Sequence, residues 1–179
     1  MNTVKHTLEQ MLNDRGFHVT ERKKTYWVAV KTNTATTTYV NFLNPEDKDL
    51  KIGIETIRAI EKLLPHHETV IVVYAGSITS AAKTVASLYP KLQFFHVREL
   101  FRNITQHEFV PKHTLMTEAE AEEFLTRHKF SKDQLPKLPL SDPLAKFYHF
   151  KPGSLVRIRR KFGVQIGEYD YVRVVVEHV

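Results

Sequence analysis

The chain has 179 residues, with 26 Lys and Arg against 20 Asp and Glu, and contains no cysteine. This length suits one large domain or two small ones, and 42% hydrophobic residues with 26% charged residues are typical of a folded protein. The missing cysteine excludes disulfides, thiol nucleophiles and cysteine-based zinc sites. The longest apolar stretch, residues 70–75, is far shorter than the roughly 20 residues of a membrane helix. Because the first ten residues also lack a signal-peptide core, we expect an intracellular protein with no membrane partner.

The first hundred residues predict helices that alternate with strands. Apolar residues recur at helical spacing, and the predicted helices are residues 4–15, 54–64 and 80–89. Runs rich in β-branched and aromatic residues predict strands at residues 26–30, 37–43, 70–74 and 92–97. The apolar run of residues 70–74 is continuous, which is typical of a strand buried on both faces. The alternation predicts an α/β layer in which helices cover a sheet.

The pattern changes after residue 107. Thr117 with Glu120 predicts a capping box that starts a helix running to about residue 128. Asp142 with Pro143 predicts the start of a short helix that ends near residue 149. The strands predicted here are residues 154–159 and 169–176. We therefore expect an α/β domain over residues 1–105 and a small α+β domain with antiparallel strands over residues 106–179.

Two clusters of basic residues are candidate contacts with DNA. The clusters are Arg22, Lys23 and Lys24 in the first half, and Arg157, Arg159, Arg160 and Lys161 in the second. A formal charge of +6 fits a protein that lies near nucleic acid. Two solvated turns explain the same clusters equally well.

Patterns that would indicate catalysis are weak. Asp47, Asp49 and Lys51 resemble the acidic pattern of metal-dependent nucleases, but such enzymes hold their carboxylates on strands, and these residues fall in a charge-rich turn. The ten histidines do not have the spacing of zinc ligands. Gly76 stands alone rather than in a phosphate-binding loop, and the Gly163 to Gly167 spacing predicts a hairpin loop. We expect no catalytic residue, no metal site and no cofactor.

The aromatic residues allow two interpretations. Those that could suggest base stacking are Phe94, Phe95, Phe101, Phe109, Phe124, Phe130, Phe147, Tyr148 and Phe150. They would suit base stacking if they shared one surface, but they are spread over separate predicted elements. We therefore expect them, like the lone Trp27, to pack in the core.

From residue 103 onward the sequence closely resembles one family. The matching blocks are residues 103–113, 135–136, 141–147, 151–159 and 167–173. The family is the fifth shared subunit of eukaryotic nuclear RNA polymerases, whose C-terminal domain matches a small subunit of the archaeal RNA polymerase. From these blocks we take the signature residues His107, Pro111, His113, Leu135, Pro136, Asp142, Pro143, Gly153, Gly167, Tyr169 and Arg173.

The resemblance implies a non-catalytic subunit of a multisubunit DNA-directed RNA polymerase. Its C-terminal domain would dock on the largest subunit, and its N-terminal jaw domain would extend toward downstream duplex DNA, with no homo-oligomer. The implied location is the nucleus. The alternatives are a stand-alone nucleic-acid-binding transcription regulator and, less favoured, a metal-dependent nuclease.

The resemblance is weaker at two places. The first hundred residues match the family in α/β character alone and look like a shortened jaw domain. The family's loop also differs from residues 159–167 here, which are one residue longer. Such departures would suit a polymerase encoded by a large DNA virus, with the protein in a viral factory or virion.

Overall fold

A computed structural model describes residues 1–161 and 168–177, with Lys161 and Glu168 described by their backbones alone. The chain forms two compact units, Met1–Asn103 and Ile104–Val179, which we call the N-terminal and C-terminal units. Among the helices of the described residues, none is long and apolar enough to cross a membrane.

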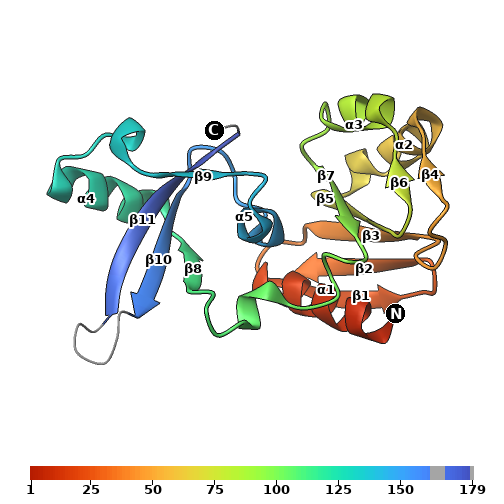
Figure 1. Ribbon diagram of the computed structural model, residues 1–179, viewed down its shortest axis with the longest axis horizontal. Coiled ribbons are helices and arrows are strands. Elements are labelled where there is room, and N and C mark those ends of the chain that lie inside the picture. The colour runs from red at the N-terminus through yellow and green to blue at the C-terminus, as the bar shows by residue number, and fades with distance from the viewer. Residues whose placement is uncertain (162–167, 178–179) are drawn as a thin grey trace. The chain divides into compact units, whose positions relative to one another are not determined.

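The N-terminal unit is built on a five-stranded sheet in the order β1-β2-β3-β5-β7 (Figure 1). Its strands are β1 (Phe17–Arg22), β2 (Tyr26–Lys31), β3 (Thr37–Leu43), β5 (Thr69–Tyr74) and β7 (Leu92–His96). Neighbouring strands run antiparallel from β1 to β3 and parallel from β3 to β7. Residues Thr69 to Val73 of β5 are all buried, which confirms the prediction of a strand covered on both faces.

Helices cover both faces of this sheet (Figure 1). The helix α1 (Asn2–Asp14) lies on one face, where Lys5 sits 5.6 Å from the ring centre of Phe42 and Arg15 donates a 2.9 Å hydrogen bond to Gln93. The helices α2 (Ile54–Glu61) and α3 (Ser80–Ala86) pack on the other face. Two short parallel strands, β4 (Lys51–Ile52) and β6 (Ser77–Ile78), lie beside these helices. The α/β prediction is confirmed.

Three details of this unit differ from the sequence prediction. The helix expected over residues 54–64 ends at Glu61, and Pro65 lies inside a separate 3₁₀ turn, η1 (Leu64–His66). The helix expected over residues 80–89 ends at Ala86, because the following residues tighten into i to i+3 hydrogen bonds. The strand β1 was not predicted. Its residues alternate between more buried and exposed positions, but most of them are polar or charged, so the sequence lacks the hydrophobic alternation of a typical strand.

The C-terminal unit contains a four-stranded sheet in the order β8-β10-β11-β9 (Figure 1). Its strands are β8 (Lys112–Leu115), β9 (Lys137–Pro139), β10 (Leu155–Lys161) and β11 (Glu168–Val176). The strand β10 pairs antiparallel with β8 and β11, whereas β9 runs parallel to β11. The predicted antiparallel strands are confirmed, but β8 and β9 were missed because runs of four and three residues carry too little pattern.

One helix packs against each face of this sheet. On the α4 face, Leu155, Val172 and Val174 pack against Phe124 and Leu125 of the helix α4 (Glu118–His128). The α5 face packs against the helix α5 (Pro143–Tyr148) and the residues that follow it. Its core residues are Leu138, Ala145, Phe150, Val156, Ile158 and Val175. Two further 3₁₀ turns are η2 (Ile104–Gln106) and η3 (Lys132–Gln134).

Both predicted helix starts in this unit are confirmed. Thr117 accepts a 3.2 Å hydrogen bond from the N–H of Glu120, whose carboxylate accepts a 2.8 Å bond from the N–H of Thr117. The Asp142 carboxylate accepts hydrogen bonds from the N–H groups of Leu144 at 2.8 Å and Ala145 at 3.4 Å. Each cap satisfies backbone donors that have no partner inside the helix.

The expectation that the aromatic residues are core residues holds only in part. Trp27, Phe95, Phe147 and Phe150 are buried. The expectation is wrong for Phe101, Phe109 and Phe130, which are 59%, 84% and 48% exposed. These three lie in bends and connecting segments outside the regular elements, where no facing layer covers them.

Gly76 gives a test of the packing between β4 and β6. A Cβ at this position would collide with the backbone carbonyl of Leu50, which accepts a 2.8 Å hydrogen bond from Ser77. We predict that Gly76→Ala lowers the free energy of unfolding by about 1–3 kcal/mol, measured by urea denaturation. Gly53→Ala is the matched control, because nothing lies within 4 Å of a Cβ there. Equal stability of the two variants would contradict this packing.

Candidate docking surface

Several signature residues build the fold of the C-terminal unit. Leu135 is buried under α4, and the carbonyl of Pro136 accepts a 3.0 Å hydrogen bond from Val174. Pro143 is the first residue of α5. Gly153 has a φ of +79°, a value that favours glycine, and its N–H donates to the carbonyl of Val175 at 2.9 Å. Gly167 lies outside the described residues.

Three other signature residues share the α5 face of the sheet. His113 on β8 is in register with Ile158, whose side chain lies in the core of this face. Tyr169 and Arg173 on β11 are in register with Arg160 and Val156 of β10. Since partners in an antiparallel pair point to the same side, His113, Tyr169 and Arg173 lie on one face.

The α5 face also carries an aromatic ring with two cations beside it, and the ring packs against the core residues of this face. The guanidinium carbons of Arg160 and Arg173 lie 5.6 and 5.4 Å from the ring centre of Tyr171, within the range of a cation–π contact. We call these three residues the Arg-Tyr-Arg cluster. Within the part of the chain that the structure describes, neither arginine forms an ion pair, and the buried Nε of Arg173 has no hydrogen-bond partner.

His113 is half-buried next to this cluster. Its Nδ1 lies 2.7 Å from the carbonyl oxygen of Pro111, so the ring donates a hydrogen bond from that nitrogen. Burial lowers the pKa of His113, and the charges of Arg173 and Arg160 lower it further, against the hydrogen bond to Pro111 and the charge of Asp142. His107 is more exposed, and its Nδ1 accepts a 3.3 Å hydrogen bond from the N–H of Phe109.

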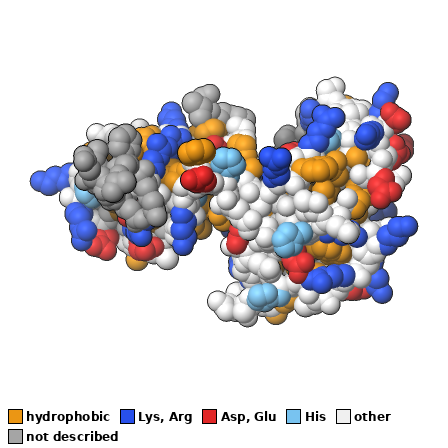
Figure 2. All heavy atoms as spheres, turned by 60° about the horizontal axis from the view of Figure 1, so that its bottom comes forward, with side chains coloured by type: hydrophobic (Ala, Val, Ile, Leu, Met, Phe, Trp, Pro, Cys, Tyr) orange, Lys and Arg blue, Asp and Glu red, His pale blue; other side chains and the backbone are white. Residues whose placement is uncertain are grey.

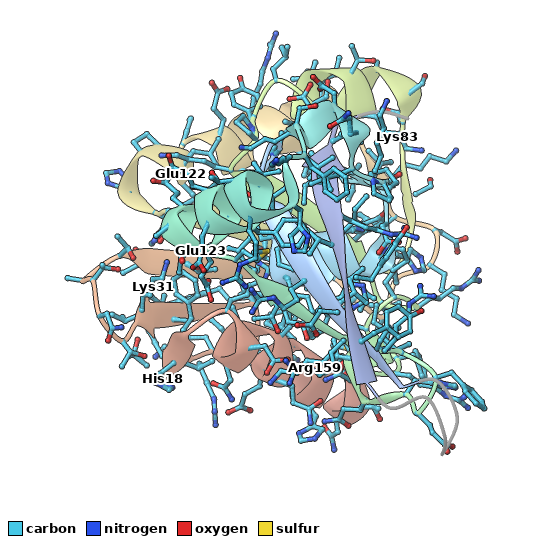
Figure 3. All side chains as sticks on the ribbon, turned by 90° about the vertical axis from the view of Figure 1, so that its left-hand side faces the viewer. His18, Lys31, Lys83, Glu122, Glu123 and Arg159 are labelled. Atoms are coloured by element: carbon cyan, nitrogen blue, oxygen red, sulfur yellow. The ribbon has the colours of Figure 1, made fainter. Side chains whose placement is uncertain are left out.

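The second basic cluster is divided between the two faces of the sheet. Arg157 and Arg159 lie on the α4 face, 3.7 and 3.1 Å from the carboxylate of Asp170. Arg157 also lies 4.0 Å from Glu120 of α4. In Figure 3, Arg159 comes from β10. Arg160 lies on the opposite face, because strand residues alternate sides. The side chain of Lys161 is outside the described residues.

The first basic cluster is partly neutralised. Arg22 pairs with Glu9 and lies 5.8 Å from the ring of Trp27, and Lys23 lies 3.8 Å from Glu21. Lys24 is exposed in the turn between β1 and β2. On the face shown in Figure 2, Lys and Arg are dispersed among acidic, apolar and neutral residues. Arg22 and Lys23 of this cluster therefore lie beside carboxylates, whereas Lys24 stays exposed.

The nuclease-like pattern lies in a turn. A carboxylate oxygen of Asp47 accepts a 3.0 Å hydrogen bond from the N–H of Asp49, and Lys51 is exposed on β4. Among the described residues, no three His, Asp or Glu side chains form a group that could hold a metal ion. The turn geometry accounts for Asp47 without a ligand.

Sequence reasoning missed Tyr171 and Asp170 as parts of these surfaces. The signal was present in the two-residue alternation along β11, which places Tyr171 with Tyr169 and Arg173 and turns Asp170 to the other side. The register that sets Asp170 opposite Arg159 depends on the pairing of β10 with β11, which the sequence pattern leaves open.

Comparison with known proteins agrees with this architecture. Residues 102–175 match the family model described as RNA polymerase Rpb5, C-terminal domain. The proteins named DNA-directed RNA polymerases I, II, and III subunit RPABC1 from Caenorhabditis elegans and Caenorhabditis briggsae are 34% and 33% identical, and each alignment covers 97% of this chain and 94% of the relative. The Dictyostelium discoideum protein of the same name is 30% identical, with 88% of each chain covered.

The matched model covers the C-terminal unit, whereas the relatives align with both units. The chain therefore belongs to the RPABC1, or Rpb5, family. The resemblance found in the signature residues is confirmed.

The environment of His113 leads to a prediction about pH. We expect its imidazole to titrate below the ordinary value of 6.5, because burial penalises the charged ring. The unfolded chain then binds the proton more readily, so the contribution of His113 to stability is complete above pH 6.5 and is lost as the pH falls below it. NMR titration of the ring protons measures the midpoint. A midpoint above 6.5 would contradict the proposed surroundings.

Proposed function

We propose that this chain is a non-catalytic structural subunit of a multisubunit DNA-directed RNA polymerase. The observation that carries the proposal is family membership over both units, since the alignment with the Caenorhabditis elegans relative covers 97% of the chain. That relative is named as a subunit of RNA polymerases I, II and III. In this proposal nucleotide addition takes place in other subunits, and the chain needs no cofactor of its own.

The proposed docking partner is the largest subunit, bound by the domain of residues 106–179. The α5 face supports this role, because it carries the half-buried residues Arg173 and Tyr171 and the exposed Tyr169. Arg and Tyr are enriched among residues that anchor protein interfaces. The chain then enters the complex as a single copy rather than as a homo-oligomer.

The domain of residues 1–105 is proposed to act as a jaw near downstream duplex DNA. DNA contacts of the chain are weak and independent of sequence in this proposal, because Arg22 and Lys23 of this domain, like Arg157 and Arg159 of the C-terminal unit, already lie beside carboxylates. Lys24 and Arg160 are the described members of the two basic clusters without such a neighbour. The protein acts in the nucleus, or in a viral factory or virion if a large DNA virus encodes the polymerase.

Purification of the native complex tests the assignment. We predict that the tagged chain retains two very large subunits at a one-to-one stoichiometry, measured by quantitative mass spectrometry, because a structural subunit is held by an extensive interface. Purification of the chain alone, with tight DNA binding and steep salt dependence, would instead favour a stand-alone regulator.

An assay of the isolated chain tests whether the turn near Asp47 is catalytic. We predict that the isolated chain has no Mg²⁺-dependent cleavage of DNA, and that Asp47→Ala, Asp49→Ala and Lys51→Ala change nothing in that assay. A cleavage activity that these substitutions abolish would overturn the structural role.

A further prediction concerns DNA itself. We predict that the isolated chain binds duplex DNA with a slope of log affinity against log salt no steeper than about −3, because most described members of the two basic clusters already lie beside carboxylates. Fluorescence anisotropy across a salt series measures the slope. A slope near −8 would mean that the paired arginines leave their carboxylates for DNA.

A further inference from the structure

The arginines on the two faces of the C-terminal sheet have different interaction partners. On the α4 face, Arg157 and Arg159 share the carboxylate of Asp170. On the α5 face, Arg160 and Arg173 flank Tyr171, and within the described residues no carboxylate pairs with either. Arg157, Arg159 and Arg160 lie on the same strand, β10, so the contrast depends on the face that each side chain occupies and not on the overall charge.

Asp142, the acidic residue whose charge acts on His113, already accepts other hydrogen bonds. The charge of Asp142 is felt by His113, as are those of Arg173 and Arg160. The carboxylate of Asp142 accepts hydrogen bonds from Leu144 and Ala145 at the start of α5. The Asp142 carboxylate therefore satisfies free N–H groups at the start of α5. Arg160 and Arg173 are left without an anionic partner among the described residues.

The side chain of Arg173 contains a hydrogen-bond donor that lacks an acceptor among the described residues. Its side chain is half-buried, and its Nε is buried without an acceptor among the described residues. A buried donor without an acceptor costs free energy, which an incoming anion with a suitable oxygen would recover. The guanidinium presents a planar set of donors that matches the two oxygens of a carboxylate.

We propose that the Arg-Tyr-Arg cluster binds a carboxylate side chain on an acidic segment of the largest polymerase subunit. This inference rests on the proposed function and specifies the contact by which the C-terminal unit docks. Arg173 receives the carboxylate, Arg160 adds a second positive charge, and the tyrosine ring holds both cations in place.

A protein carboxylate suits the site better than a DNA phosphate. The Nε of Arg173 is buried, so an acceptor must reach into the surface, and a side chain of a closely packed partner does so. A sliding duplex is held instead by exposed cations, and Arg157 and Arg159 of the α4 face already lie beside carboxylates. Tyr169, which is 40% exposed on the same face, adds contact area typical of a protein interface.

The test compares matched arginine variants in the full chain, co-expressed with the largest subunit. Arg173→Met removes the charge and the buried Nε while it keeps an unbranched apolar side chain, and Arg159→Met is the control on the opposite face. We expect Arg173→Met to weaken retention of the largest subunit at least about tenfold and Arg159→Met less than about twofold, as judged by titrated pull-down.

A second variant separates loss of contact from loss of fold. Arg160 is exposed, so Arg160→Glu leaves the core intact and is expected to weaken retention at least as strongly, with an unchanged circular dichroism spectrum. Acidic residues of the largest subunit are then replaced by Arg one at a time. We expect one of these replacements to restore binding of the Arg160→Glu variant. Wild-type retention by both variants would overturn the proposal.

The remaining outcomes are also decisive. If both variants keep the largest subunit but lose affinity for duplex DNA, the cluster binds phosphate and the proposal is wrong. If the wild-type chain retains no large subunit, the proposed function fails and this contact fails with it. If the wild type and both variants retain it equally, the proposed function stands and only the carboxylate site is excluded.

Discussion

The pairing of β10 with β11 is the constraint on which the C-terminal unit depends. This antiparallel ladder runs from Leu155 with Val174 to Lys161 with Glu168, and it decides which side chains face α4 and which face α5. A shift of one residue would exchange the two faces and bury charge under both helices. The apolar residues Val156, Ile158 and Val175 fix the register, and the arginines between them take their faces from it.

The pairing of β10 with β11 also determines which arginines lie beside a carboxylate, and the net charge of the chain does not. On the α4 face, the carboxylate of Asp170 lies beside both Arg157 and Arg159 and balances part of their charge. The other face keeps Arg160 and Arg173 beside Tyr171 without a carboxylate among the described residues. The α5 face of the C-terminal sheet therefore carries a localised basic and aromatic site. Such a site favours a specific protein contact over sliding on DNA.

Sequence reasoning predicted the elements with strong local signals. The continuous apolar run of β5, the capping box at Thr117 and the cap at Asp142 are dictated by near neighbours, and the structure has all three. Other features depend on contacts between residues far apart in the sequence, which hydrophobic periodicity does not predict. These features are the short strands β8 and β9 and the ion-pair partners of Arg157. The exposure of Phe109 was missed for a related reason, since its hydrophobicity says nothing about whether a layer covers it.

Family membership over both units makes the structural role the central claim. A cryo-EM reconstruction of the polymerase purified from the organism that carries this chain tests it most directly. The account predicts one copy of the chain in the map, with its α5 face against the largest subunit and an acidic side chain at Arg173. A complete, active polymerase whose map has no density for this chain would contradict the account.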